Sequence, residues 1–250
     1  MAAFAIAFLF ATLSSSDAIV TVLNSPSASS VARYGEAERI VMREAEAGKP
    51  LQQFVYGVTA KDPAVRTKYC NRSREKIKEL AEKTNNSLAW YLLSLEANDL
   101  ELLKRAAEGG NVQALNAYGA MLVDAACKRD KDRSGSAEKA FAKGYDCFRR
   151  AAAQKDPNGY INLGTCYLRG LGCEQNLALA HQAFRSAAEA GHPEGMDYVS
   201  ASFELGHGVP KNPSLALVWR MKAKAVRGDK AAEEWLREGG RMKGEGGSGR

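Results

Sequence analysis

Apolar and small residues recur at three- and four-residue intervals along most of this chain, which is the spacing of one face of an α-helix. The clearest stretch places Gly159, Leu163 and Tyr167 on one face. The apolar face that follows is rich in alanine, which allows helices to approach closely; it comprises Leu179, Ala180, Ala183, Phe184, Ala187 and Ala188. Runs of β-branched residues are short. The pattern therefore predicts an all-α protein.

Two stretches near the C-terminus repeat each other without a gap. In the first, Gly170-Leu171-Gly172 precedes Asn176 and an apolar helix. The same residue types return 36 positions later, at Gly206, Gly208 and Asn212. A period of this length indicates an array of identical supersecondary units. We predict that each unit is two helices joined by a turn, with glycine ending the first helix and asparagine beginning the second.

This order of residues resembles the Sel1-like repeat family over residues 158–228. The match is carried by Gly206-His207-Gly208-Val209-Pro210-Lys211-Asn212, then Leu215-Ala216 and Trp219, and by Ala187–Gly191 in the unit before. The resemblance implies a right-handed α/α superhelical solenoid, related to tetratricopeptide arrays, in which each repeat contacts only its neighbours. It also implies a non-catalytic adaptor for a protein or peptide, since family members commonly scaffold membrane-associated complexes.

Weaker copies of the pattern lie upstream. In residues 112–155, the first predicted helix precedes the corresponding helix of the next unit by 45 positions, whereas the second helix precedes its counterpart there by 36 positions. The difference predicts an insertion, which we place in a polar loop at Lys128–Ser136. Earlier segments fit degenerate helices: Ala37–Ala47, Leu51–Gly57, Ile77–Ala81, Ala89–Leu92 and Leu102–Gly110. With Ala231–Leu236 as a closing helix, we expect about five helix pairs.

The resulting domain organisation separates the two termini from the helical array. We expect a signal peptide at 1–18, a flexible lead-in at 19–33, degenerate repeats at 34–110, regular repeats with the closing helix at 111–238, and a disordered basic tail at 239–250. The apolar run Ala2–Leu13 is too short to span a bilayer and suits a secretory segment, with a cleavage site after Ala18. The expected location is secreted, periplasmic or lumenal, and an organellar transit sequence is the alternative. No other stretch is long enough to span a membrane.

Five cysteines are compatible with an oxidising compartment. They allow at most two intrachain bridges. Cys166 could approach either Cys147 or Cys173, or each cysteine could simply be a small buried residue.

The formal charge is +6, and the basic residues are densest over 220–250. Because Glu233, Glu234 and Glu238 are interspersed there, we favour an ordinary solvated helix face. The alternative is a polyanion-binding region. We do not expect nucleic acid as a partner.

Candidate chemistry is sparse, and we expect no catalytic residue, no cofactor and no metal site. None of the three histidines has a partner at metal-ligand spacing. The Gly-x-Gly turns lie between two helices, which excludes a dinucleotide loop. Ser73-x-x-Lys76 and Ser136-x-x-Lys139 match the nucleophile motif of penicillin-recognising enzymes, but without its Lys-Thr-Gly or Ser-Asp-Asn partners. A cell-wall or lactam-directed hydrolase is therefore the enzymatic alternative.

Binding is the favoured mode of action. By resemblance to tetratricopeptide geometry, a concave wall would present outward positions of the first helices. Those positions are Asn116, Asp124, Ile161, Asn162, Thr165, Arg169, Asp197, Tyr198 and Glu204. Amides, an aromatic ring and charges of both signs form a surface able to bind a peptide through hydrogen bonds.

Overall fold

The computed structural model describes residues 42–43, 45–129 and 135–239, and all regular secondary structure in that part of the chain is helical. The all-α class is therefore confirmed. The chain divides into two compact units between Asn111 and Val112. The signal peptide, the lead-in, residues 240–250 of the tail and most of the helix expected at Ala37–Ala47 lie outside the described residues.

The first unit consists of α4 (Pro50–Thr59), α5 (Pro63–Thr84), α6 (Ser87–Ala97) and α7 (Leu100–Glu108). α4 packs on α5, α5 on α6, and α6 on α7. Its core contains the fully buried side chains of Phe54, Ile77 and Leu92. α5 is 22 residues long, far beyond the short segment expected around Ile77, and its start is capped by Asp62, whose carboxylate accepts from the Ala64 N–H at 2.8 Å.

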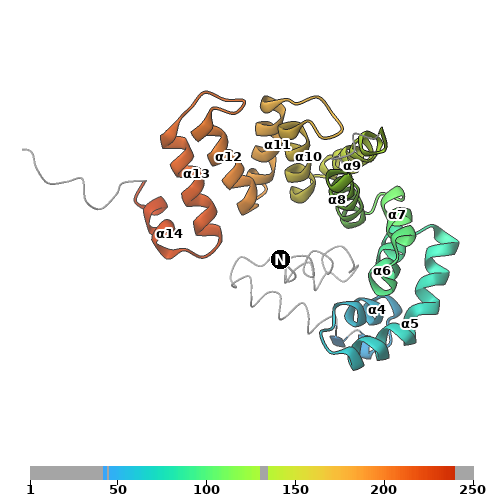
Figure 1. The fold of residues 1–250 in the computed structure, drawn as a ribbon. Coiled ribbons are helices and arrows are strands. Elements are labelled where there is room, and N and C mark those ends of the chain that lie inside the picture. Colours follow the sequence, from blue (N-terminus) through green and yellow to red (C-terminus); the bar gives the residue numbers. More distant parts are fainter. Residues whose placement is uncertain (1–41, 44, 130–134, 240–250) are drawn as a thin grey trace, which may run out of the picture. The chain divides into compact units, whose positions relative to one another are not determined.

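The second unit is a row of helix pairs (Figure 1). Its helices are α8 (Val112–Arg129), α9 (Gly135–Ala153), α10 (Pro157–Arg169), α11 (Leu177–Glu189), α12 (Pro193–Leu205), α13 (Pro213–Val226) and α14 (Lys230–Arg237). α8 pairs with α9, α10 with α11, and α12 with α13, while α14 closes the end on α13. The second helix of each pair also packs on the first helix of the next pair. This sequential packing of helix pairs is that of an α-solenoid.

The insertion expected as a polar loop at Lys128–Ser136 is helical at both of its ends, because α8 continues to Arg129 and α9 begins at Gly135. α8 has 18 residues and α9 has 19, whereas α10 and α11 have 13 each. The added turns are stable because they carry buried alanines: Ala126 is 1% exposed and Ala137 is 3% exposed. Residues 130–134 between the two helices lie outside the described part.

Small residues set how closely the helices of one pair approach. A Cβ atom at Gly164 would lie 2.6 Å from the Phe184 ring, so only glycine admits that ring. Phe184 is 2% exposed and belongs to a core cluster with Ala180, Met196 and Val199. At Gly164, a small residue therefore lets α10 approach α11 closely.

In the turn between paired helices, glycine ends the first helix and asparagine begins the second, as predicted. Gly206 has a φ of 79°, and the Asn212 side chain accepts from the Leu215 N–H at 3.0 Å to begin α13. Asn176 does the same at the start of α11. Gly208 has a second role, because a Cβ atom there would lie 2.2 Å from the Leu177 carbonyl oxygen. The turn after α12 is thereby seated on the start of α11, and it helps to form a pocket.

Candidate partner-binding surface of the second unit

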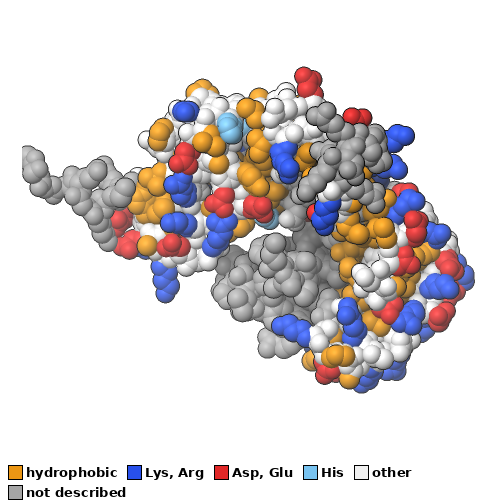
Figure 2. All heavy atoms as spheres, in the orientation of Figure 1, with side chains coloured by type: hydrophobic (Ala, Val, Ile, Leu, Met, Phe, Trp, Pro, Cys, Tyr) orange, Lys and Arg blue, Asp and Glu red, His pale blue; other side chains and the backbone are white. Residues whose placement is uncertain are grey.

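The first helices of successive pairs lie beside one another: α10 contacts both α8 and α12. We call the side chains that these three helices present the first-helix row. All nine residues expected to bind a partner are on these helices, two on α8, four on α10 and three on α12. Figure 2 shows side chains of both charge signs interspersed with hydrophobic ones over the second unit.

A polar network joins α8 to α10 within this row. Asn162 donates its side-chain amide to Oδ1 of Asn116 at 3.2 Å, and Asn116 donates to Oδ2 of Asp156 at 2.8 Å. The same carboxylate oxygen accepts from the Gly159 N–H at 2.7 Å, which caps α10. Asp156 is 6% exposed. Asn116 and Asn162 therefore use some of their hydrogen-bonding capacity inside the protein, and both remain half-buried at its surface.

His192 stands 36 residues after Asp156, at the same position before α12. Its side chain makes no capping hydrogen bond, and its buried Nδ1 has no partner. Burial lowers the pKa of His192, the Arg227 cation lowers it further, and the nearby carboxylates of Glu194 and Asp156 oppose the shift. Burial thus favours the neutral imidazole at this cap.

Other expected binding residues are engaged in ion pairs or in packing. Glu204 accepts from Arg220 at 2.6 Å, Asp197 pairs with Arg227, and Asp124 pairs with Lys128 on its own helix. These pairs are exposed, so each stabilises the fold only slightly and its members can exchange partners.

Three residues of α10 differ in how accessible their side chains are to a partner. Ile161, expected at the surface, is only 6% exposed and packs between helices. Thr165 donates its hydroxyl to the Ile161 carbonyl at 2.9 Å. Arg169, in contrast, is exposed and has no ion pair with any residue that the structure describes.

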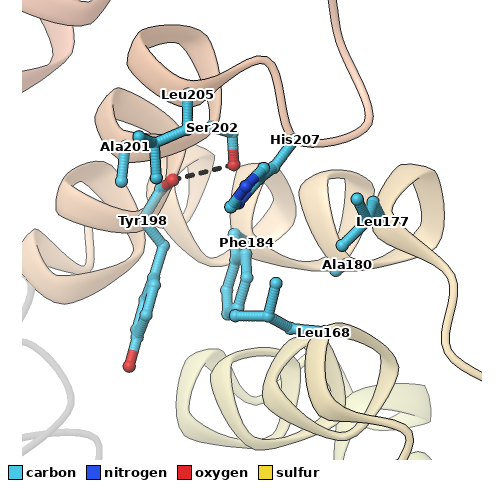
Figure 3. Close-up of a pocket in the computed structure, with 9 residues that line it drawn as sticks. All are labelled: Leu168, Leu177, Ala180, Phe184, Tyr198, Ala201, Ser202, Leu205 and His207. Atoms are coloured by element: carbon cyan, nitrogen blue, oxygen red, sulfur yellow. Dashed lines mark hydrogen bonds between the residues drawn. The ribbon is translucent and has the colours of Figure 1, made fainter.

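Tyr198 links the first-helix row to a pocket between α10, α11 and α12. Its ring stacks on Phe184, with centroids 4.2 Å apart and planes 12° from parallel. The pocket has a volume of about 200 Å³ and is mostly apolar. Its lining is Leu168, Leu177, Ala180, Phe184, Tyr198, Ala201, Ser202, Leu205 and His207 (Figure 3). The hydroxyl of Ser202 donates to the Tyr198 carbonyl at 2.9 Å, so this polar group of the wall is already satisfied.

Sequence reasoning missed this pocket, although one signal was available. Leu205 stands 36 residues after Arg169, so an apolar residue replaces a charged one at the same position of the repeat. Leu205 is 54% exposed and lines the pocket.

The cysteines are all free thiols. Burial and the neighbouring Cys173 raise the pKa of Cys166 to about 12, and burial chiefly raises that of Cys70 to about 11. A high pKa suppresses the thiolate, so these buried cysteines act as small core residues.

Ser73 is not placed for nucleophilic catalysis. It lies in the middle of α5, fully buried, and its hydroxyl donates to the Tyr69 carbonyl at 2.8 Å. The other candidate, Ser136, lies outside the residues whose side chains are described. Within the described residues, no group of three or more His, Cys, Asp or Glu side chains could hold a metal ion.

Two residues of the basic region 220–250, Arg220 and Arg227, pair with Glu204 and Asp197, which leaves less positive charge for the alternative of polyanion binding. Among the described helices, none is both long and apolar enough to cross a membrane.

Comparison with solved structures supports the architecture. The chain is similar to a protective antigen present in uropathogenic Escherichia coli strains that displays an SLR fold; the TM-score is 0.55, the identity is 18%, and the match covers 93% of this chain and 56% of the antigen. It thus spans little more than half of that protein, and the likeness shows the fold alone. A Sel1 repeat protein from Oxalobacter formigenes is 27% identical over 51% of this chain and 90% of its own length, with a TM-score of 0.44.

The repeats themselves are matched by a family profile described as Sel1 repeat. It matches residues 100–111, 132–156, 157–192 and 193–219. The last two segments repeat with the period of 36 residues seen in the sequence. The repeats in residues 100–219 of this chain are therefore Sel1 repeats.

Proposed function

We propose that this Sel1-repeat scaffold protein is a non-catalytic adaptor that binds another protein along its first-helix row. The observation that carries the proposal is the row itself, in which three neighbouring helices present half-buried amides, an aromatic ring and charges of both signs. Such groups bind a peptide through side-chain hydrogen bonds and through stacking, while the packed helix pairs keep them at fixed spacing.

The ion pairs of the row support a binding surface that exchanges partners. Asp197 and Glu204 are about half exposed, and their arginines come from α13 and the turn that follows it. An incoming cationic side chain can replace either arginine at small cost, because an exposed pair contributes about 0–1 kcal/mol. Asn116 and Asn162 keep hydrogen-bonding groups available, since each amide has more donors and acceptors than its internal bonds use.

The hydrolase alternative has less support. It would need a serine presented to solvent with a lysine one helical turn away, and Ser73 is buried in mid-helix. A labelled lactam tests the remaining candidate directly: a covalent adduct on Ser136 of the full chain would contradict the non-catalytic proposal.

We further propose that the protein works in a secretory or extracytoplasmic compartment, on the grounds of the apolar segment Ala2–Leu13. N-terminal sequencing of the protein isolated from its own host tests this. A mature chain that begins at Asp17, Ile19 or nearby supports export, whereas an intact segment contradicts it.

The adaptor function is tested by co-precipitation of the tagged full chain from its host under mild crosslinking. We expect specific partners to be lost with Tyr198→Ala combined with Arg169→Glu, because these substitutions remove an aromatic contact and reverse an unpaired charge in the row. Gln182→Ala combined with Arg149→Glu provides the matched control, since both residues are exposed on second helices. Equal loss with both variants would overturn the proposal.

A further inference from the structure

We propose that the pocket between α10, α11 and α12 receives one aliphatic side chain, a leucine or its equivalent, from a partner segment whose flanking residues are acidic. This proposal rests on the proposed function, because Tyr198 belongs to both the first-helix row and the pocket wall. It adds the chemical class of the segment that is bound.

The size of the pocket fixes how much it can hold. Sites for small molecules usually have volumes of about 300–1,000 Å³. At about 200 Å³, this pocket is smaller and accepts a single side chain. Its walls are formed by leucine, alanine and aromatic side chains, so they favour an apolar occupant.

The mouth of the pocket is already marked by an exposed apolar side chain. Leu205 is 54% exposed, and covering it would remove apolar surface from water. The neighbouring Ser202 offers no free donor, because its hydroxyl is bonded to the Tyr198 carbonyl. Apart from the His207 imidazole, the wall is mostly apolar, so a polar occupant would lose much of its hydration with few hydrogen bonds to replace it.

The charges around the mouth select the residues beside the inserted side chain. Lys211 packs its aliphatic stem against the turn, since its Cγ lies 3.0 Å from the position of a Cβ on Gly206. This places the lysine stem beside Gly206, which lies in the chain between the lining residues Leu205 and His207. Arg169 directly follows the lining residue Leu168. Neither Lys211 nor Arg169 has an ion pair in the described part of the chain.

The acidic side chains nearby do not cancel these cations. Glu204 is adjacent to Leu205 but already pairs with Arg220 at 2.6 Å. Glu174, in the turn before α11, is exposed and has no ion pair among the described residues. Its single negative charge is outnumbered by the positive charges of Lys211 and Arg169. Acidic flanking residues are therefore attracted to the rim, and basic ones are repelled.

The test uses the full chain labelled with ¹³C at its leucine methyl groups and titrated with three hexapeptides. The peptides are acetyl-Gly-Asp-Glu-Leu-Asp-Gly-amide, the same peptide with lysine at every acidic position, and the same acidic peptide with serine in place of leucine. We expect the first peptide to shift the methyl signals of Leu168, Leu177 and Leu205 at the lowest concentration, the lysine peptide to need a higher one, and the serine peptide to leave them unchanged. The affinity of the first peptide should be about tenfold higher than that of the lysine peptide and should fall with added salt.

Variants distinguish two contributions to peptide binding: insertion of the apolar side chain into the pocket and attraction by charges at its rim. Ala201→Phe fills the pocket and should abolish the shifts. Leu205→Ser removes the exposed apolar side chain at the mouth and should weaken binding, and it serves as the test if Ala201→Phe proves unstable. Lys211→Glu should reduce the preference for acidic flanks, whereas Lys143→Glu, exposed on α9, should not.

The outcomes distinguish this inference from the proposed function. Equal binding of the acidic and lysine peptides, or binding that survives both Ala201→Phe and Leu205→Ser, would overturn the inference. If co-precipitated partners still depend on Tyr198 and Arg169 in that case, the adaptor function stands without the leucine pocket. If both experiments fail, the proposed function falls as well.

Discussion

Asn162 on α10 donates its side-chain amide to Asn116 on α8, with 3.2 Å between the nitrogen and Oδ1. The two residues belong to successive repeats, so this bond fixes one first helix against the next. It also orients both amides, because Asn116 donates in turn to Asp156 at 2.8 Å. The expected binding residues are therefore held in place by one another, which lowers the entropy that a partner must remove on binding.

Asn116→Ala should destabilise the second unit more than Asn162→Ala. The first substitution removes the bond to the Asp156 carboxylate and leaves Asn162 without its acceptor, at a cost of about 1–3 kcal/mol. The second removes a single neutral bond worth about 0.5–1.5 kcal/mol. Urea unfolding followed by circular dichroism measures both. An equal or reversed order would show that the network does not join the helices.

Gly208→Ala should cost more stability than Gly206→Ala, although both glycines have positive φ values, 75° and 79°. The backbone strain is similar in the two variants, about 1–2 kcal/mol. A methyl group on residue 208 would also meet the Leu177 carbonyl oxygen at 2.2 Å, whereas at residue 206 it would meet the flexible Lys211 side chain at 3.0 Å.

Overpacking against fixed backbone adds about 1–3 kcal/mol, so the difference between these two variants should be resolvable by thermal or urea unfolding. Equal stabilities would mean that the turn after α12 is not seated on α11.

Alkylation by iodoacetamide should modify Cys127 first. Cys127 is exposed, whereas Cys70 and Cys166 are buried and their pKa values are raised to about 11 and about 12. Intact-mass analysis at neutral pH should show one rapid adduct that is absent from Cys127→Ser. Cys166 should react only after unfolding in urea, and rapid native labelling of Cys166 would contradict its position in the core.

Acid should destabilise the second unit partly through His181, which is 7% exposed and packs edge-on against Phe203 with ring centroids 5.3 Å apart. Burial, assisted by the Arg185 cation, lowers the pKa of His181 from its ordinary value of 6.5. Above that value the histidine is neutral in both states and its effect on stability is constant.

As the pH falls through 6.5, the unfolded chain gains the proton first, so the free energy of unfolding decreases until the pH passes the lowered pKa of the folded state. His181→Phe should therefore lose less stability than the unmodified protein between pH 7.5 and 5.5. Identical pH profiles would contradict this role.

Those helices that follow the sequence repeat were predicted correctly. The period of 36 residues located α10, α11, α12 and α13, because glycine and asparagine recur where the chain must turn. The length of α5 was not predicted, since most of its side chains face solvent and interrupt the apolar spacing. The extension of α8 to Arg129 and the start of α9 at Gly135 were not predicted, because the polar residues at these two ends interrupt the apolar spacing.

The binding surface was predicted only in part. Placement of Asn116, Asn162 and Tyr198 on neighbouring first helices follows from the repeat. Their contacts do not, since a hydrogen bond between residues 46 positions apart depends on how the helices cross. The pocket depends on the seating of one turn on another helix, which no local pattern records.

Site-specific photocrosslinking is the most direct test of the central claim that partners bind along the first-helix row. A benzophenone amino acid would be introduced singly at Arg169 and Asp197 on the row, and at Gln182 and Glu189 on α11, all of which are side chains with exposed surface. The full chain would then be irradiated with the partners captured in its own host. The account predicts adducts from Arg169 and Asp197 and none above background from the two α11 positions. Adducts formed mainly from Gln182 and Glu189 would contradict it.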